Sequence, residues 1–144
     1  FDEQLKRAMH HAKRKDLNVG LIVCDLNKFK LINDNFGHDV GDKVLSHFAL
    51  ALQESIRDSD SVFRFGGDEF VILVEDCATY SLSMIERRIY NAMSKDIVLT
   101  NYHVSSSVGF TFMRDSDDES SLFKRADQEL YRQKMNISRN LSIV

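Results

Sequence analysis

The chain has 144 residues and a net charge of −3, with 43% hydrophobic and 28% charged residues. These proportions are typical of a soluble globular protein, the length fits one domain over residues 1–144, and no apolar run is long enough to span a membrane. Because lysines and arginines are scattered through a chain that is acidic overall, a nucleic acid polymer is excluded as a partner. A small nucleotide neutralised by a metal ion stays open as a ligand.

Apolar residues at helical spacing predict a first helix over residues 1–15. The nearly unbroken apolar run of residues 19–24 predicts a strand that is covered on both faces and ends on Asp25. Apolar positions three and four residues apart predict a second helix over residues 40–56. The polar segment between this strand and this helix, residues 25–42, is interpreted as a loop.

Two β-rich runs, residues 61–65 and 70–74, are separated by Gly66 and Gly67, which predicts a hairpin. Later periodic segments predict a third helix, an alternating strand and a last helix over residues 82–93, 104–112 and 122–131. Strand, helix, two hairpin strands, helix and strand is the order of the ferredoxin-like α+β fold, whose central, mainly antiparallel sheet is flanked by helices. Because this fold hosts many functions, the function has to be argued from the site.

Three carboxylates are expected to meet at one end of this sheet. The first strand lies in the middle of the ferredoxin-like sheet beside the hairpin, so Asp25 is expected close to Asp68 and Glu69. Crowded carboxylates repel one another unless a cation compensates them, and Mg²⁺ prefers a few carboxylate oxygens plus phosphates. The alternative is a plain Gly-Gly turn with two solvated acids at its tip.

The segment 25–42 adds a second group of polar residues. A loop of this kind can bind phosphates through backbone N–H groups and a lysine, while the side chains of Asn33 and Asp42 can bind the edge of a base. An Asp can accept hydrogen bonds from the N–H donors of guanine. The alternative for any one of these residues is a turn or a helix cap, and Asp39 in particular is a candidate cap of the second helix.

Two further features concern the cell compartment. Cys24 and Cys77 lie in or beside apolar runs, which indicates buried thiols in a reducing compartment, and we expect the cytoplasm. The first residues show no signal peptide. The chain begins within a helical pattern, so we expect a fragment of a longer protein.

Together, the sequence Phe-Gly-Gly-Asp-Glu-Phe of residues 65–70 and the segment 25–42 resemble the GGDEF family of diguanylate cyclases. Further matches lie in the strand 104–110 and from Ala126 to Lys134, and the resemblance runs over about residues 1–140. So many spaced matches are far more specific than one pentapeptide. The resemblance implies a nucleotidyl-cyclase palm that condenses two GTP molecules into cyclic di-GMP and two pyrophosphates.

The resemblance also implies roles for individual residues. The catalytic acids are Asp25, Asp68 and Glu69. The metal ligands are these three side chains and the backbone carbonyl of Leu26, with Mg²⁺ as the ion and Mn²⁺ as an alternative. The substrate-binding residues, which hold guanine and the triphosphate, are Asn33, Asp42, Phe29, Lys30, Lys134 and Gly67.

A second site is implied by the Arg-x-x-Asp sequence, which is separated from Gly66 by five residues. The resemblance makes Arg57 and Asp60 a product-inhibition site for cyclic di-GMP, to which Arg87 or Arg88 adds a contact. Guanidinium and carboxylate groups can grip phosphate and guanine together. The alternative for a bare Arg-x-x-Asp is a solvated helix end followed by a turn.

The resemblance further implies a homodimer in which two turns oppose each other, each with one GTP. It implies an upstream sensor or receiver domain, either in a cytoplasmic protein or in the cytoplasmic part of a membrane-bound sensor. The family's lead-in segment, Asp-x-Leu-Thr-Gly-Leu, is not present before Phe1, and Ser138 stands where the family has a glycine beside the phosphate ligand that would correspond to Arg139.

Two rival functions stay open. The first is a binding module that holds GTP or cyclic di-GMP without turnover, for which degenerate motifs would be the signature. The second is a nucleotidyl transferase or cyclase of the palm type that acts on another substrate, against which Asp42 favours guanine. The acidic run of residues 115–119 is interpreted as a solvated loop and helix start.

Overall fold

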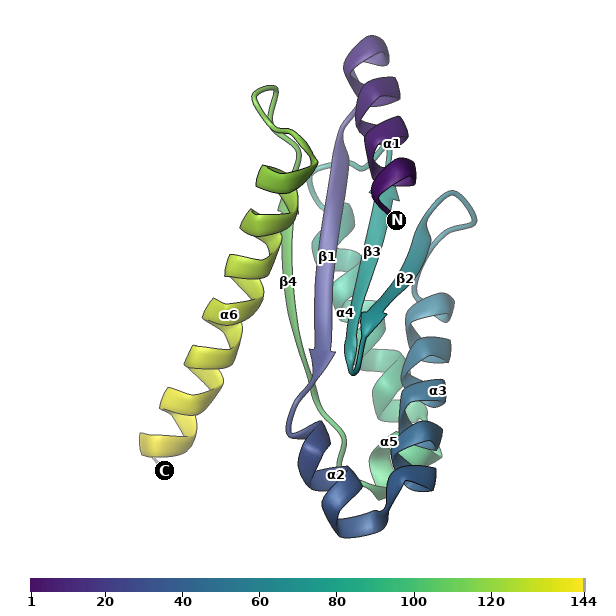
Figure 1. Cartoon of the computed structure of the whole chain (residues 1–144), viewed down its shortest axis with the longest axis vertical. Coiled ribbons are helices and arrows are strands. Elements are labelled where there is room, and N and C mark those ends of the chain that lie inside the picture. Colours follow the sequence, from purple (N-terminus) through teal and green to yellow (C-terminus); the bar gives the residue numbers. More distant parts are fainter. Residues whose placement is uncertain (144) are drawn as a thin grey trace.

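The structure is a computed structural model that describes the backbone of residues 1–143 and the side chains of residues 1–136. Helices flank one four-stranded sheet (Figure 1). In chain order they are α1 (Asp2–Lys15), β1 (Val19–Leu26), α2 (Phe29–Phe36), α3 (His38–Glu54), β2 (Ser61–Gly66), β3 (Glu69–Glu75), α4 (Ser81–Lys95), α5 (Ile97–Asn101), β4 (Ser106–Phe112) and α6 (Glu119–Ile143).

The four strands form one antiparallel sheet in the order β2-β3-β1-β4. All eight residues of β1 are buried, because it pairs with β3 on one side and β4 on the other and carries helices on both faces. The predicted α+β fold with its central antiparallel sheet is therefore confirmed. The first strand lies beside the hairpin, as the ferredoxin-like topology predicted.

Alternation along β1 divides the interior into two hydrophobic clusters. Leu21 and Val23 pack under α1 and α6, whereas Ile22 and Cys24 pack under α3 and α4 on the opposite face. Figure 1 shows α6 and α1 on one side of the sheet and α3 and α4 on the other. Both cysteines are buried and unpaired, as predicted.

The interpretation of residues 25–42 as one loop was wrong. Its middle forms α2, because Phe29 and Ile32 lie three residues apart on one face and pack on the α3 and α4 side of the core. The second helix begins at His38 rather than Val40, and Gly37 is its N-cap. Asp39 is therefore inside the first turn and does not cap the helix. The short helix α5 was not predicted at all, since five residues are too few to show a period.

The acidic run before α6 is not simply a solvated loop, which corrects the interpretation from sequence. Asp117 is only 5% exposed and forms a bidentate ion pair with Arg125, at 2.6 and 2.8 Å. The same guanidinium donates to Thr111 Oγ1 and to the carbonyl of Phe112. This cluster ties the start of α6 to the end of β4, since both elements bind one arginine.

Helix α6 lies very close to the sheet at Gly109 of β4. A Cβ atom at Gly109 would be 2.1 Å from the backbone nitrogen of Leu130, so no larger residue fits without moving the helix. One turn further on, α6 brings Lys134 to the end of β1. No helix among residues 1–143 combines the length and the apolar character needed to cross a bilayer.

Candidate active site at the end of strand β1

Asp25 lies near the end of β1, directly opposite Glu69, the first residue of β3. Directly opposed residues of antiparallel strands point to the same face, here the face covered by α6. Asp25 is 8% exposed, and its Oδ2 atom accepts a hydrogen bond from Lys134 Nζ at 2.5 Å. Its other oxygen, Oδ1, is buried and has no hydrogen-bond partner. The structure therefore brings Glu69 to Asp25, as predicted, and adds Lys134, whose contact with Asp25 was not predicted.

The burial of Asp25 and the acidic residues around it disfavour the charged form of its carboxyl group. Burial raises the pKa of the Asp25 carboxyl, Lys134 lowers it in part, and the neighbouring Asp68 and Asp127 raise it again. Burial is also the largest cause of the raised pKa of Glu69, followed by the charges of Asp127 and Asp25. Four carboxylates thus share one end of the sheet, where a cation would be stabilised.

Asp127 is the residue of this group that sequence reasoning missed. It lies on α6 seven residues before Lys134, a spacing of nearly two full turns, so both side chains project from the same face of the helix. That spacing was visible in the sequence. It did not indicate a site residue, because the sequence did not show that Lys134 faces Asp25.

The donor set fits a metal ion that keeps phosphate ligands. Asp25 Oδ1 is a buried carboxylate oxygen without a partner, and such an orphaned oxygen is suited to a hard cation. No group of three or more His, Cys, Asp or Glu side chains within the described part of the chain is arranged to hold a metal. Asp25, Asp68 and Glu69 are therefore neighbours, but the expected arrangement of all three as metal ligands is not found among the described residues. Mg²⁺ needs few protein ligands when a substrate supplies phosphate oxygens.

The hairpin turn is held from one side by Arg64. Its Nε and Nη2 atoms donate to the carbonyl of Gly67 at 3.1 and 2.7 Å. Gly66 and Gly67 have φ angles of 120° and 43°, which favour glycine, and no atom lies within 4 Å of an added Cβ at either residue. The turn is therefore fixed in shape but open to a ligand.

A short connection joins β1 to α2 at the same end of the sheet. Lys28 has a left-handed backbone, with φ 55° and ψ 35°, which turns the chain into the helix. Asn27 donates to Ser105 Oγ at 3.0 Å and accepts from Ser107 Oγ at 2.8 Å, so this connection is tied to β4. The first amides of α2, at Phe29 and Lys30, have no partner in a preceding helical turn and can bind an anion.

The predicted guanine-binding residues lie at the contact between α2 and α3. A Cβ atom at Gly41 would be 1.8 Å from Asn33 Oδ1, so the missing side chain makes room for the Asn33 amide at the residue that precedes Asp42. Asp42 also lines a cavity of about 480 Å³ between α3 and β2, to which Arg64 and Phe70 contribute. A nucleobase placed there would lie between the helix and the hairpin.

The chain matches the family described as "Diguanylate cyclase, GGDEF domain" over residues 1–140. This chain belongs to the GGDEF family. Among solved structures, it is similar to the active GGEEF domain of a diguanylate cyclase from Vibrio cholerae, with 31% identity, a TM-score of 0.87 and coverage of 94% of this chain and 88% of that one. It is also similar to the GGDEF domain of DgcB from Caulobacter crescentus in complex with c-di-GMP, with 26% identity, a TM-score of 0.86 and coverage of 94% and 83%.

Curated relatives of this GGDEF domain are longer proteins. Diguanylate cyclase DgcS of Shewanella oneidensis is 36% identical over 134 residues, which are 93% of this chain and 45% of that protein. Response regulator PleD of Caulobacter vibrioides is 36% identical over 122 residues, which are 81% of this chain and 27% of that protein. The chain thus spans less than half the length of these relatives.

The predicted second site of this GGDEF domain lies away from the carboxylates. Asp60 has a fully buried side chain and accepts hydrogen bonds from the backbone N–H, Nε and Nη2 of Arg57. Arg57 Nη2 also donates to the carbonyl of Glu75 at 2.9 Å. Arg57 and Arg88 line one cavity of about 210 Å³, whereas the exposed Arg87 is not among its lining residues. Of Arg87 and Arg88, the two candidates on the third predicted helix, only Arg88 therefore shares a cavity with Arg57.

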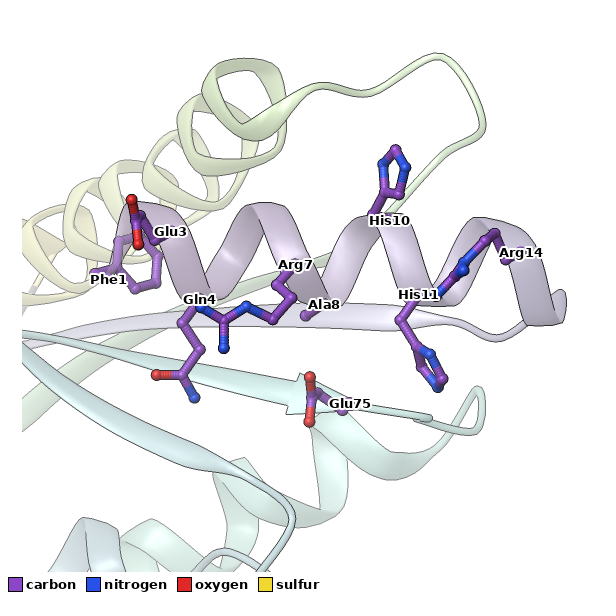
Figure 2. A pocket seen from close by; sticks show the side chains of 9 residues that line it. All are labelled: Phe1, Glu3, Gln4, Arg7, Ala8, His10, His11, Arg14 and Glu75. Atoms are coloured by element: carbon purple, nitrogen blue, oxygen red, sulfur yellow. The ribbon is translucent and has the colours of Figure 1, made fainter.

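A larger cavity, of about 730 Å³, lies between α1 and the end of β3. Figure 2 shows Arg7, His11 and Arg14 along the helix, with Glu75 of β3 below them, while His10 points away from the sheet. None of the site residues predicted from the sequence lines this cavity. Arg139, which would correspond to the family's phosphate ligand, lies outside the described side chains.

Proposed function

We propose that this GGDEF domain is a diguanylate cyclase, which joins two GTP molecules into cyclic di-GMP and releases two pyrophosphates. The observation that carries the proposal is the buried Asp25, which faces Glu69 and Lys134 and keeps one oxygen unpartnered. Membership of the GGDEF family, with relatives named as diguanylate cyclases, supports it. The linkage would form when the 3′-hydroxyl of one GTP attacks the α-phosphorus of the other.

In this proposal Asp25, Asp68 and Glu69 hold Mg²⁺, with the carbonyl of Leu26 as a further ligand. When bound, the metal would lower the pKa of the attacking hydroxyl and neutralise charge on the phosphates. Glu69 would also lie beside the attacking hydroxyl. The fit rests on the unpartnered Asp25 Oδ1 and on the mutual repulsion of the acids.

The triphosphate would be bound by groups from three elements. Lys30 and the amides near Phe29 lie at the start of α2, Lys134 lies on α6, and the backbone of Gly67 lies at the open turn. Helix N-termini and lysines are suited to phosphate groups. Because these elements meet at one end of the sheet, the protein's main contribution would be to position the reactants.

Selectivity for guanine would come from Asn33 and Asp42. A carboxylate accepts from the N1–H and amino group of guanine, whereas adenine offers no such pair of donors, so an acid at this position rejects ATP. The close approach of Asn33 to Gly41, beside Asp42, supports the pairing of the two residues. The cavity bordered by Asp42 is large enough for a base.

Catalysis would need two copies of the chain. Each copy has one hairpin turn and one set of base-binding residues, so one copy binds one GTP. A two-fold homodimer would place the two nucleotides antiparallel, with each 3′-hydroxyl facing the other α-phosphate. We also propose a location in the cytoplasm and control by an upstream sensor or receiver domain, which the greater length of the relatives supports.

We further propose product inhibition at Arg57 and Asp60, with Arg88 as the third contact and Arg87 on its outer side. The cavity shared by Arg57 and Arg88 supports two guanidinium groups on one phosphate. Because Arg57 is already bound to Asp60, the carboxylate holds the guanidinium in place for a ligand. An Arg57→Ala variant should stay active when cyclic di-GMP is added.

The test is incubation of the protein with GTP and Mg²⁺, followed by chromatographic detection of cyclic di-GMP. We expect product from the unaltered chain and a loss of at least about 100-fold in Asp25→Asn, because removing a metal-binding or electrostatic group costs that much in comparable sites. Asp115→Asn is the matched control, since Asp115 is an exposed acid that follows β4 at the end of the sheet opposite to the site. Tight GTP or cyclic di-GMP binding without any turnover would overturn the proposal in favour of a binding module.

A further inference from the structure

The ion pair between Lys134 and Asp25 connects the proposed triphosphate-binding site with the proposed metal site. Lys134 Nζ lies 2.5 Å from Asp25 Oδ2. The Asp25 side chain is 11% exposed, whereas the Lys134 side chain is 41% exposed and approaches from α6. The lysine is thus the solvent-facing and movable partner of a nearly buried acid.

A metal ion at Asp25 would need the oxygens that this lysine restrains. An ammonium group and a divalent cation are both stabilised by the same carboxylate, and each repels the other at close range. With Oδ2 bound to Nζ, only Oδ1 is free of a hydrogen bond. Binding of the metal alone therefore requires that Lys134 moves away or that both cations share one carboxylate.

We propose that Lys134 is an internal counter-ion that competes with the metal for Asp25, so that metal enters the site together with the nucleotide rather than before it. This inference rests on the proposed function, which places the metal at Asp25. The triphosphate removes the conflict, because it offers the ammonium group another set of anionic oxygens. Metal and nucleotide then bind cooperatively, and each raises the affinity for the other by the same factor.

The geometry around the pair favours such a transfer. An ammonium group has three N–H donors, and one of them reaches Asp25 Oδ2 in the structure. The start of α2 lies at the same end of the sheet as Asp25, so phosphates held by the amides near Phe29 would lie within reach of a flexible lysine. The lysine can therefore exchange one anion for another without a change in the fold.

The experiment measures Mn²⁺ binding in the absence of nucleotide, by the electron paramagnetic resonance signal of free Mn²⁺ at neutral pH. We expect Lys134→Met to bind Mn²⁺ about five- to tenfold more tightly than the unaltered chain, as expected for loss of one competing, partly exposed ion pair. Lys134→Arg keeps the charge and should bind Mn²⁺ as the unaltered chain does. Lys124→Met is the matched control, because it removes one positive charge from the same helix, whereas the ion-pair partner of Asp25 is Lys134.

Adding a non-hydrolysable GTP analogue should raise the Mn²⁺ affinity of the unaltered chain strongly. The factor by which it raises the Mn²⁺ affinity of Lys134→Met should be at least fivefold smaller, since the competition has already been removed there. Equal or weaker Mn²⁺ binding in Lys134→Met, with an unchanged melting temperature, would overturn the competition. If the melting temperature of Lys134→Met is lowered, Mn²⁺ binding is measured in Lys134→Gln, which keeps a polar donor for Asp25. Mn²⁺ binding in Lys134→Gln that is no tighter than in the unaltered chain would also overturn the inference.

One further variant separates this inference from the proposed function. Asp25→Asn should abolish the Mn²⁺ binding that Lys134→Met strengthens. If Mn²⁺ binding is the same in Asp25→Asn as in the unaltered chain, the metal does not lie at Asp25 and the proposed metal site is wrong. If binding depends on Asp25 but not on Lys134, only the competition is wrong.

Discussion

Replacement of Gly109 by alanine tests whether the position of α6 matters for both stability and the site. The added Cβ would lie 2.1 Å from the backbone nitrogen of Leu130 and 2.6 Å from the backbone carbon of Glu129. Ordinary contacts of this kind begin at 3.4 Å, so the helix must move by more than about 1 Å, because backbone atoms cannot rotate away. Overpacking of this kind costs about 1–3 kcal/mol.

The same movement should reach the site, because α6 carries Lys134 one turn beyond the contact. A displacement of about 1 Å lengthens the Lys134–Asp25 contact and shifts the phosphate-binding group, and misplacement by that distance can reduce a rate by up to about 100-fold. We expect kcat/KM for GTP to fall by about tenfold or more, in addition to a loss of about 1–3 kcal/mol of unfolding free energy. Urea denaturation and initial-rate measurements on one preparation give both numbers.

Gly20→Ala is the matched control for this variant. It adds the same methyl group to the same sheet, but the three atoms nearest to that group are side-chain carbons of Leu82, the nearest at 2.7 Å, on the face away from α6. A leucine side chain can adjust, so the loss of stability should be smaller and kcat/KM unchanged. If Gly109→Ala is no less stable than Gly20→Ala, or if it keeps full turnover, the close approach of α6 to Gly109 does not determine stability and the site as expected.

Three further variants test other parts of the account. Gly41→Ala should raise KM for GTP by about tenfold in steady-state kinetics, because the added Cβ would lie 1.8 Å from Asn33 Oδ1 and would displace it. An unchanged KM would mean that Asn33 does not bind the base. Asp42→Ser should reduce the preference for GTP over ATP, as measured by the ratio of the two kcat/KM values, and an unchanged ratio would mean that guanine is recognised elsewhere. Asp117→Asn should lose about 2–3 kcal/mol at pH 7, since its pKa is held well below the usual value by Arg125. The stabilisation by Asp117 is present above about pH 4 and disappears as the pH falls towards the lower pKa of the folded state. In urea denaturation, the difference in unfolding free energy between the variant and the unaltered chain should therefore shrink below about pH 4. A difference that does not depend on pH would exclude the ion pair as its cause.

The sequence predicted the sheet and most helices because their apolar patterns are long and regular. The run of β1, the alternation of β4 and the hairpin around Gly66 and Gly67 each have a clear period or turn signal. Helix α2 was missed because half of its eight residues are polar and Ile32 is its one buried residue. A segment of this kind resembles a loop until tertiary packing is known.

The site could be predicted only as far as chain topology determines it. Asp25 and Glu69 come together because strand order and register place them opposite each other. The contact of Lys134 with Asp25 depends on how closely α6 approaches the sheet at Gly109, which no local pattern specifies. The approach of Asp127 depends on the same packing, and the sequence did not indicate it.

The most direct test of the central claim is the balance of products formed from GTP and Mg²⁺ as the protein concentration is varied. We expect one cyclic di-GMP for every two pyrophosphates, and a rate per chain that rises with concentration until the dimer is fully formed. Release of pyrophosphate without cyclic di-GMP would contradict the account, as would a rate per chain that does not depend on concentration in a protein shown by sedimentation to be monomeric.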